Sequence, residues 1–181
     1  MLKVRPLLGQ VLFLITLMSV SILDFWAPAS SLPKALTDSM IRDVEERLSV
    51  EMPKELITLL KVQNGGYTKG FVFPTKQGTS WSHNHVPIDE LFGIVSNYFA
   101  DTVPNISTSN EISEEWGLPP KQVLLCGDGH WFITLDYRES TIPSVAWIDT
   151  EMGEDVQLAK DFATFFNGLV DSDSFDYEEE D

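Results

Sequence analysis

The sequence predicts one α+β domain in which helices pack against an antiparallel sheet. Helical patterns at residues 38–48 and 53–63 come first, three strand-like runs follow one another later in the chain, and an aromatic-rich helical pattern closes it at 159–169. With 181 residues, 43% of them hydrophobic, the chain can bury one substantial core. We therefore expect a single domain over residues 24–170.

The first helical pattern is amphipathic. Its apolar residues recur at intervals of three and four: Met40, Ile41, Val44 and Leu48. Charged residues fill the opposite face, and Thr37 or Asp38 can accept a hydrogen bond from a free N–H at the amino end. This helix should lie with one side on the core.

The segment 52–66 predicts a second helix with a defined stop. Pro53 suits the first turn of a helix, where its missing N–H would have had no partner. Three leucines at helical spacing form a stripe that should face the sheet: Leu56, Leu59 and Leu60. Gly65 and Gly66 can take positive φ at little steric cost, so the helix should end there and the chain reverse.

The middle of the chain predicts a brief strand at 71–73, halted by Pro74, and then a polar surface loop over 75–87. The loop carries one aromatic and two of the three histidines: Trp81, His83 and His85. Residues 88–94 form a short buried segment, and residues 95–109 show no regular period. Loops of this kind often hold binding residues.

Three runs rich in β-branched and aromatic residues follow a short helix at 111–116. They are residues 122–126, 130–137 and 144–149. Gly127-Asp128-Gly129 is a strong reversal signal, so an antiparallel meander is the economical arrangement, with the middle run central. Val156 and Leu158 indicate a fourth short strand, and the final helix should close over the sheet.

The charge excludes one class of partner. The formal net charge is −16, and the residues before Asp171 still carry 21 acids against 12 bases. Such a chain repels phosphate backbones, so we predict no nucleic-acid binding. The acidic end, residues 171–181, has too little apolar content to offset the cost of ordering and is predicted to be a disordered tail.

The amino terminus allows three interpretations. Residues 1–23 form a hydrophobic leader that could be a signal peptide, cleaved near Ala27-Pro28-Ala29, or an uncleaved membrane anchor. Alternatively, translation starts at Met18, which we favour because Phe25 and Trp26 are typical of core residues. We accordingly expect a cytoplasmic protein, with anchoring or export through residues 1–29 as the alternative and membrane contact only if the leader is an anchor.

Candidate chemistry is sparse. His83 and His85 could bind a metal with His130 and Asp128, but two histidines in a loop are a weak signal and are usually solvated. The serines lack nucleophile-elbow surroundings, and no glycine pattern meets the needs of a phosphate loop. The lone Cys126 lies in an apolar run and is predicted to be a buried thiol. The residues therefore predict no enzyme, no cofactor and no metal.

The chain resembles the SUKH superfamily in the order and spacing of its motifs. The resemblance covers roughly residues 22–170 and includes VEERLSVEMPKELITLLKVQNGG, PTKQGTSWSHNHVPIDELFGI, LLCGDGHWFITLDYR, VAWIDTEMGED and AKDFATFFNGLV. The most specific pieces are the Pro53 helix with its Asn64-Gly65-Gly66 stop, and the Gly129-His130 turn leading into residues 135–138. Two features depart from the pattern: Trp131 directly follows His130, and a hydrophobic leader precedes the domain.

The resemblance implies an α+β fold without catalysis and a function in protein binding. Superfamily members include yeast cell-wall assembly regulators and bacterial immunity proteins that neutralise toxins. We expect an immunity protein against a toxin with a basic nuclease domain; the alternative is a non-catalytic scaffold or regulator of envelope assembly. Aromatic side chains beside acids supply the candidate interface: Trp81, His83, His85, Asp89, Glu90, Glu114, Glu115, Asp128 and Trp131. For Trp131, core packing is an equal alternative.

Overall fold

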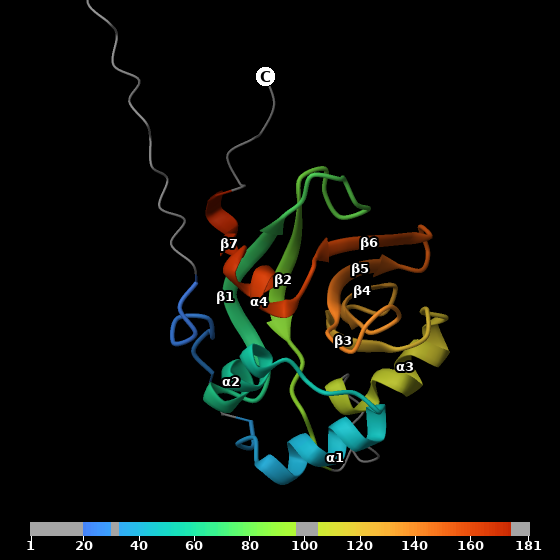
Figure 1. The fold of residues 1–181 in the computed structure, drawn as a ribbon. Helices are drawn as coiled ribbons and strands as arrows, with labels where there is room; N and C mark the ends of the chain where they lie inside the picture. Colours follow the sequence, from blue (N-terminus) through green and yellow to red (C-terminus); the bar gives the residue numbers. More distant parts are fainter. Residues whose placement is uncertain (1–19, 30–32, 97–104, 175–181) are drawn as a thin grey trace, which may run out of the picture.

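The fold is an α+β domain with two antiparallel sheets and four α-helices among the described residues (Figure 1). The computed structural model describes residues 20–29, 33–96 and 105–174. The helices are α1 (Asp38–Leu48), α2 (Lys54–Val62), α3 (Ser109–Trp116) and α4 (Phe162–Asn167). The strands are β1 (Gly66–Pro74), β2 (His85–Leu91), β3 (Gln122–Gly127), β4 (Trp131–Asp136), β5 (Ser144–Asp149), β6 (Glu154–Ala159) and β7 (Val170–Asp171). The predicted fold class is confirmed.

The helix α1 forms as its spacing predicts. Thr37 is the residue that caps it, since its Oγ1 accepts a hydrogen bond from the Met40 N–H at 3.3 Å. Met40, Val44 and Leu48 are buried along one side. The amphipathic pattern therefore placed three of its four core residues correctly, whereas Ile41 is only partly buried at the edge of the stripe.

The helix α2 ends in a junction that ties two distant segments together. The helix ends before the predicted glycine stop, at Val62 with Gln63 extended, and Gly65 and Gly66, with φ of 91° and 126°, then turn the chain into β1. The buried side chain of Asn64 accepts a hydrogen bond from the Ile94 N–H at 2.9 Å and donates to the Ile94 carbonyl at 2.8 Å. A Cβ on Gly93 would lie 2.1 Å from the Asn64 carbonyl oxygen, so only glycine fits there.

The strand β1 is longer than predicted. It runs from Gly66 rather than from residue 71, because a bulge between Tyr67 and Phe71, with Gly70 at φ 90°, lets the chain keep pairing with β2. The predicted loop is correspondingly shorter, since His85 already pairs with Pro74. The predicted buried segment after the loop is mostly the strand β2.

The second sheet is the predicted meander. Its strand order is β3-β4-β5-β6, all antiparallel, with β4 inside it. The buried Thr134 hydroxyl of β4 donates to the Gln122 Oε1 of β3 at 2.6 Å, which satisfies both polar groups in the core. The fourth strand, expected from Val156 and Leu158, is β6.

Two sheets stand where we expected one. The first has the order β2-β1-β7, and it meets the second where the Phe92 N–H, just beyond β2, donates to the Leu125 carbonyl of β3 at 2.7 Å. Hydrophobic periodicity reports which face of a strand is buried but not which strand it pairs with. The sequence therefore could not divide the strands between sheets.

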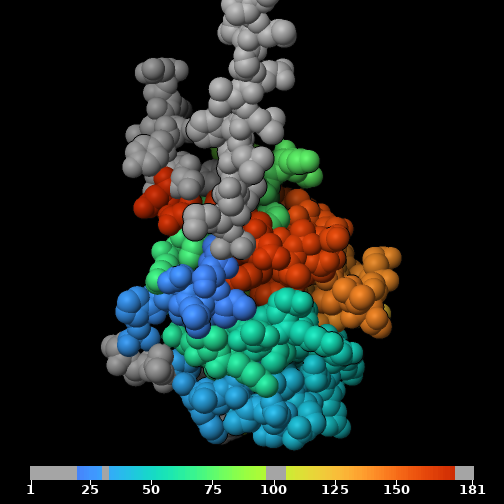
Figure 2. All heavy atoms as spheres, turned by 60° about the vertical axis from the view of Figure 1, so that its left-hand side comes forward, coloured from blue at the N-terminus to red at the C-terminus, as the bar shows by residue number. Residues whose placement is uncertain are grey.

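The amino-terminal segment and α4 close the core. Phe25 stacks on Phe71 at 5.5 Å between ring centroids and contacts Phe166 of α4 at 5.6 Å. Figure 2 shows this blue segment between the red carboxyl-terminal elements and the teal of α2. Phe25 and Trp26 are buried, as predicted.

The predicted start of the last helix is wrong by three residues. Ala159 still pairs with Val145 as the end of β6, and the Asp161 carboxylate then accepts a hydrogen bond from the Thr164 N–H at 2.7 Å. This cap fixes the start of α4 at Phe162. The buried face of α4 is the predicted one.

The predicted tail begins too early. Asp171 pairs with Phe71 across β7 and β1, and a 3-10 turn follows at Ser172–Ser174. The rest of the tail, residues 175–181, and most of the predicted leader, residues 1–19, lie outside the described residues. In the part of the chain that the structure describes, no helix has the length and apolar character needed to cross a membrane.

Candidate functional site

The loop over residues 75–84 covers one end of the four-stranded sheet. Its anchor is Ser80, whose hydroxyl donates to Asp149 Oδ2 at 2.6 Å and whose N–H donates to Glu154 Oε2 at 2.9 Å. Asp149 ends β5 and Glu154 begins β6, so the loop is attached to both strands of the last hairpin. The loop therefore lies on a rigid support.

A stack of three tryptophans runs from the core to the surface beneath this loop. Trp147 is fully buried and lies parallel to Trp131, with 4.8 Å between ring centroids and 14° between planes. Trp131 meets Trp81 edge to face at 5.6 Å, and Trp81 is 48% exposed. We call these three residues the tryptophan stack. It presents one aromatic ring to solvent on a fixed base, which is typical of an interface anchor.

Trp131 combines the two alternatives that the sequence left open, core packing and exposure at the surface. It is half-buried, because its ring stacks on the buried Trp147 and also meets the exposed Trp81. The position is therefore a link between core and surface. The sequence offered no sign of Trp147 as the third member, since it lies among apolar residues of β5.

The two acids beneath the loop are structural. Asp149 is 2% exposed, and burial opposes its ionisation; hydrogen bonds from Ser80 and from the N–H groups of Met152 and Glu151 outweigh this and lower its pKa. Glu154 accepts hydrogen bonds from Trp147 Nε1 and Ser80 N. Both carboxylates therefore accept hydrogen bonds from within the fold and help to hold the loop on the sheet.

The turn between β3 and β4 adds an exposed acid next to the stack. The Asp128 N–H donates to the Trp131 carbonyl at 3.3 Å, and Asp128 Oδ1 lies 3.3 Å from His130 Nδ1. A Cβ on Gly129 would lie 3.2 Å from the ring of Trp116, so this indole covers the turn. Asp128 is therefore a neighbour of the tryptophan stack, as an interface acid should be.

Trp116 is an exposed aromatic that the sequence analysis missed. It ends α3, directly after Glu114 and Glu115, and it is 42% exposed. The rule that selected Trp81, an aromatic residue beside acids, applies to Trp116 as well. The two glutamates are exposed on α3, and Trp116 connects that helix to the β3–β4 turn.

The two loop histidines do not form a metal centre in the described structure. His85 Nδ1 lies 2.7 Å from Asn84 Oδ1 and 3.2 Å from the Ser82 hydroxyl, and His83 is exposed. Across residues 20–29, 33–96 and 105–174, no three His, Cys, Asp or Glu side chains group closely enough to hold a metal. Cys126 is buried as predicted, and burial raises the pKa of its thiol.

Asp89 and Glu90 lie at the other end of β2 from the loop. Glu90 pairs with the exposed Tyr67 of β1, whereas the loop joins β2 at His85. Burial raises the pKa of Glu90, and the charge of Asp89 adds to this shift. The structure therefore brings Trp81, Trp131 and Asp128 together and places the Asp89-Glu90 pair apart from them.

Replacing Glu90 with glutamine should stabilise the protein at neutral pH. The pKa of Glu90 is raised in the folded state. Between the ordinary glutamate pKa and this raised pKa, the folded protein holds a proton that the unfolded chain has released. The free energy of unfolding therefore falls as pH rises through this range. Glutamine carries no charge, so Glu90→Gln should raise the urea midpoint at pH 7 but change it little near pH 4. Glu114→Gln, on an exposed helix face, is the control; an equal gain from both variants would contradict the assignment.

The fold and the site define a small α+β protein that presents exposed aromatic rings on a rigid frame. The chain belongs to the SMI1/KNR4 family (SUKH-1), whose model matches residues 35–168, well over half of its length. The expected superfamily is thereby confirmed. None of the curated proteins compared with the chain matches it.

Proposed function

We propose that this chain is an immunity protein that binds the toxic domain of a protein toxin and neutralises it inside the producing cell. The single observation that carries this proposal is the tryptophan stack, which holds Trp81 half-exposed above a fully buried ring. Binding through such an anchor needs no catalytic group. Membership of the SUKH-1 family is consistent with the same role.

Charge favours a basic toxin domain such as a nuclease. The residues before Asp171 carry a net charge of −9, and exposed acids lie near the stack at Asp128 and on α3. Opposite charge speeds the encounter of two proteins and lets an acidic surface compete with nucleic acid for the same groove. The proposed interface residues remain Trp81, His83, His85, Asp89, Glu90, Glu114, Glu115, Asp128 and Trp131, to which we add Trp116.

Growth rescue tests this function. The carboxyl-terminal domain of a toxin encoded beside this chain's gene is expressed from an inducible promoter, with and without the chain. We expect the chain to restore growth, because it should cover the toxin's active surface. The absence of such a neighbouring gene, or killing that continues at excess chain, would contradict the proposal.

Trp81→Ala should remove protection with little loss of fold. Truncating a central aromatic anchor weakens binding by about 2 kcal/mol or more, whereas losing one edge-to-face contact with Trp131 costs about 1 kcal/mol of folding stability. Val62→Ala, which removes part of an equally exposed apolar side chain on α2, is the control and should protect fully. The urea midpoint of each variant separates lost binding from lost folding.

The second candidate is a scaffold or regulator of envelope assembly. The uncharged run from Pro6 to Leu23 favours it, because such a run can act as an anchor. Fractionation of cells that produce the full chain decides the matter. Recovery in the membrane fraction that is abolished by removing residues 1–19 would support the scaffold, and recovery only in the soluble fraction would remove its basis.

A further inference from the structure

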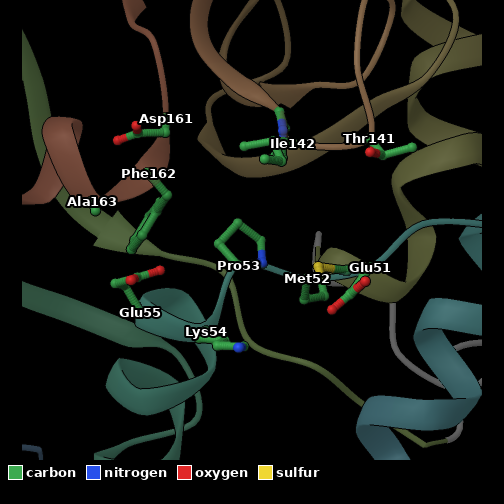
Figure 3. Close-up of a pocket in the computed structure, with 11 residues that line it drawn as sticks. Glu51, Met52, Pro53, Lys54, Glu55, Thr141, Ile142, Asp161, Phe162 and Ala163 are labelled. Atoms are coloured by element: carbon green, nitrogen blue, oxygen red, sulfur yellow. The ribbon is translucent and has the colours of Figure 1, made fainter.

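We propose that a groove beside the β4–β5 turn, at the opposite end of β4 from Trp131, binds an arginine side chain of a protein partner. The cavity has a volume of about 360 Å³ and lies between the start of α2, the β4–β5 turn and the start of α4. Figure 3 shows Pro53 at its centre, with Phe162 and Ile142 directed toward the same space. None of the proposed interface residues lines it, so this site goes beyond the proposed function.

The floor and wall of the groove are apolar. Phe162 and Met52 are core residues that show one side to the cavity, and Pro53 covers the space between them. Ile142 is 70% exposed at the tip of the β4–β5 turn, an unusual position for a large aliphatic side chain. These surfaces suit the methylene stem of arginine and the flat face of its guanidinium group.

The rim of the groove is acidic. Glu51, Glu55 and Asp161 line it against a single base, Lys54. Figure 3 shows the carboxylates of Asp161 and Glu55 on one side of Pro53 and that of Glu51 on the other. The Asp161 carboxylate caps α4 by accepting hydrogen bonds from the side chain and the backbone N–H of Thr164, and these bonds lower its pKa and keep it ionised. Acidic side chains therefore flank Pro53 on both sides, which favours a cationic occupant.

The groove is held open by contacts behind it. The buried Tyr137 hydroxyl donates to the Glu51 carbonyl at 2.7 Å, and the Met52 N–H donates to Glu45 Oε1 at 2.8 Å. These bonds fix the segment that enters α2 to β4 and to α1. A pre-formed groove loses little freedom on binding, which favours recognition of a short segment.

Arginine fits better than lysine because its planar group can bind two carboxylates while lying flat on a ring. The probe is the acetylated and amidated peptide Gly-Leu-Arg-Leu-Gly, compared with the same peptide carrying citrulline, which has nearly the same shape and no charge. Amide NMR spectra of the full chain are recorded as each peptide is added. We expect saturable shifts at Glu55, Ile142 and Ala163 with the arginine peptide and about tenfold weaker binding of the citrulline peptide.

Variants of the rim complete the test. Glu51→Gln and Glu55→Gln should each weaken binding about twofold to fivefold, while Glu151→Gln in the exposed β5–β6 turn should leave it unchanged. Equal binding of the two peptides, shifts outside the groove, or no saturation in the millimolar range would overturn the proposal. The growth-rescue assay tests the interface around Trp81, and the peptide titration tests this groove. Failure of one experiment therefore does not imply failure of the other.

Discussion

Asn64→Ala should lower the free energy of unfolding by about 3–5 kcal/mol, a large share of the roughly 5–15 kcal/mol of a domain. The side chain is buried and makes three hydrogen bonds, two with the backbone of Ile94 and one with the Lys34 carbonyl at 3.0 Å. Alanine would leave the buried N–H and carbonyl of Ile94 without these partners. The measurement is urea denaturation followed by circular dichroism.

The matched control is Asn110→Ala, which changes the same side chain on the exposed face of α3. We expect its effect to stay within about 0.5 kcal/mol. Asn64→Asp keeps the acceptor for the Ile94 N–H but turns a buried carboxylate toward the Lys34 and Ile94 carbonyl oxygens, so at pH 7 it should be at least as damaging as Asn64→Ala. A loss below about 1 kcal/mol for Asn64→Ala would show that the junction does not hold α2 to the exit of β2.

Asp149→Ala should be the second most damaging change, at about 2–4 kcal/mol. It removes the acceptor of the Ser80 hydroxyl and of two N–H groups in the β5–β6 turn, and the carboxylate is almost fully buried. The bond from the Ser80 N–H to Glu154 would remain as the loop's other anchor, so the loop should open more readily and expose Trp131 more often. A shift of tryptophan fluorescence to longer wavelength before global unfolding would report this local opening.

The Asp149 carboxylate should also make the free energy of unfolding fall at low pH. Its pKa is lowered in the folded state, so its contribution is present above the ordinary aspartate value and is lost as pH falls through the lowered one. Wild type should therefore lose more stability than Asp149→Asn between pH 5 and pH 3, values that bracket the ordinary aspartate pKa of about 3.9. Equal losses in the two proteins would contradict this role.

Local elements could be predicted because their signals are local. The stripe of α1, the leucines and glycines of α2 and the alternation along β4 each concern neighbours within one turn or one strand. The errors arose where a distant partner decided the outcome. The extension of β1 depends on β2, the ordering of Asp171 depends on Phe71, and the late start of α4 depends on the pairing of Ala159 with Val145.

The candidate site divides in the same way. Trp81 could be chosen because an aromatic residue in a polar loop has few apolar neighbours to bury it. Its support could not be predicted, since Ser80 and Asp149 are 69 positions apart and no pattern links them. Trp116 was within reach of the rule applied to Trp81, whereas the groove around Pro53 depends on three segments that only the fold brings together.

Titration calorimetry of the toxin domain into the purified chain measures the stoichiometry and affinity of the proposed complex. We expect equimolar binding that blocks the toxin's activity only as complexes form, and a loss of about 2 kcal/mol, close to thirtyfold in affinity, for Trp81→Ala. Equal affinity for wild type and Trp81→Ala would contradict the tryptophan stack as the anchor. Inactivation of the toxin by far less than one equivalent of the chain would contradict binding as the mechanism.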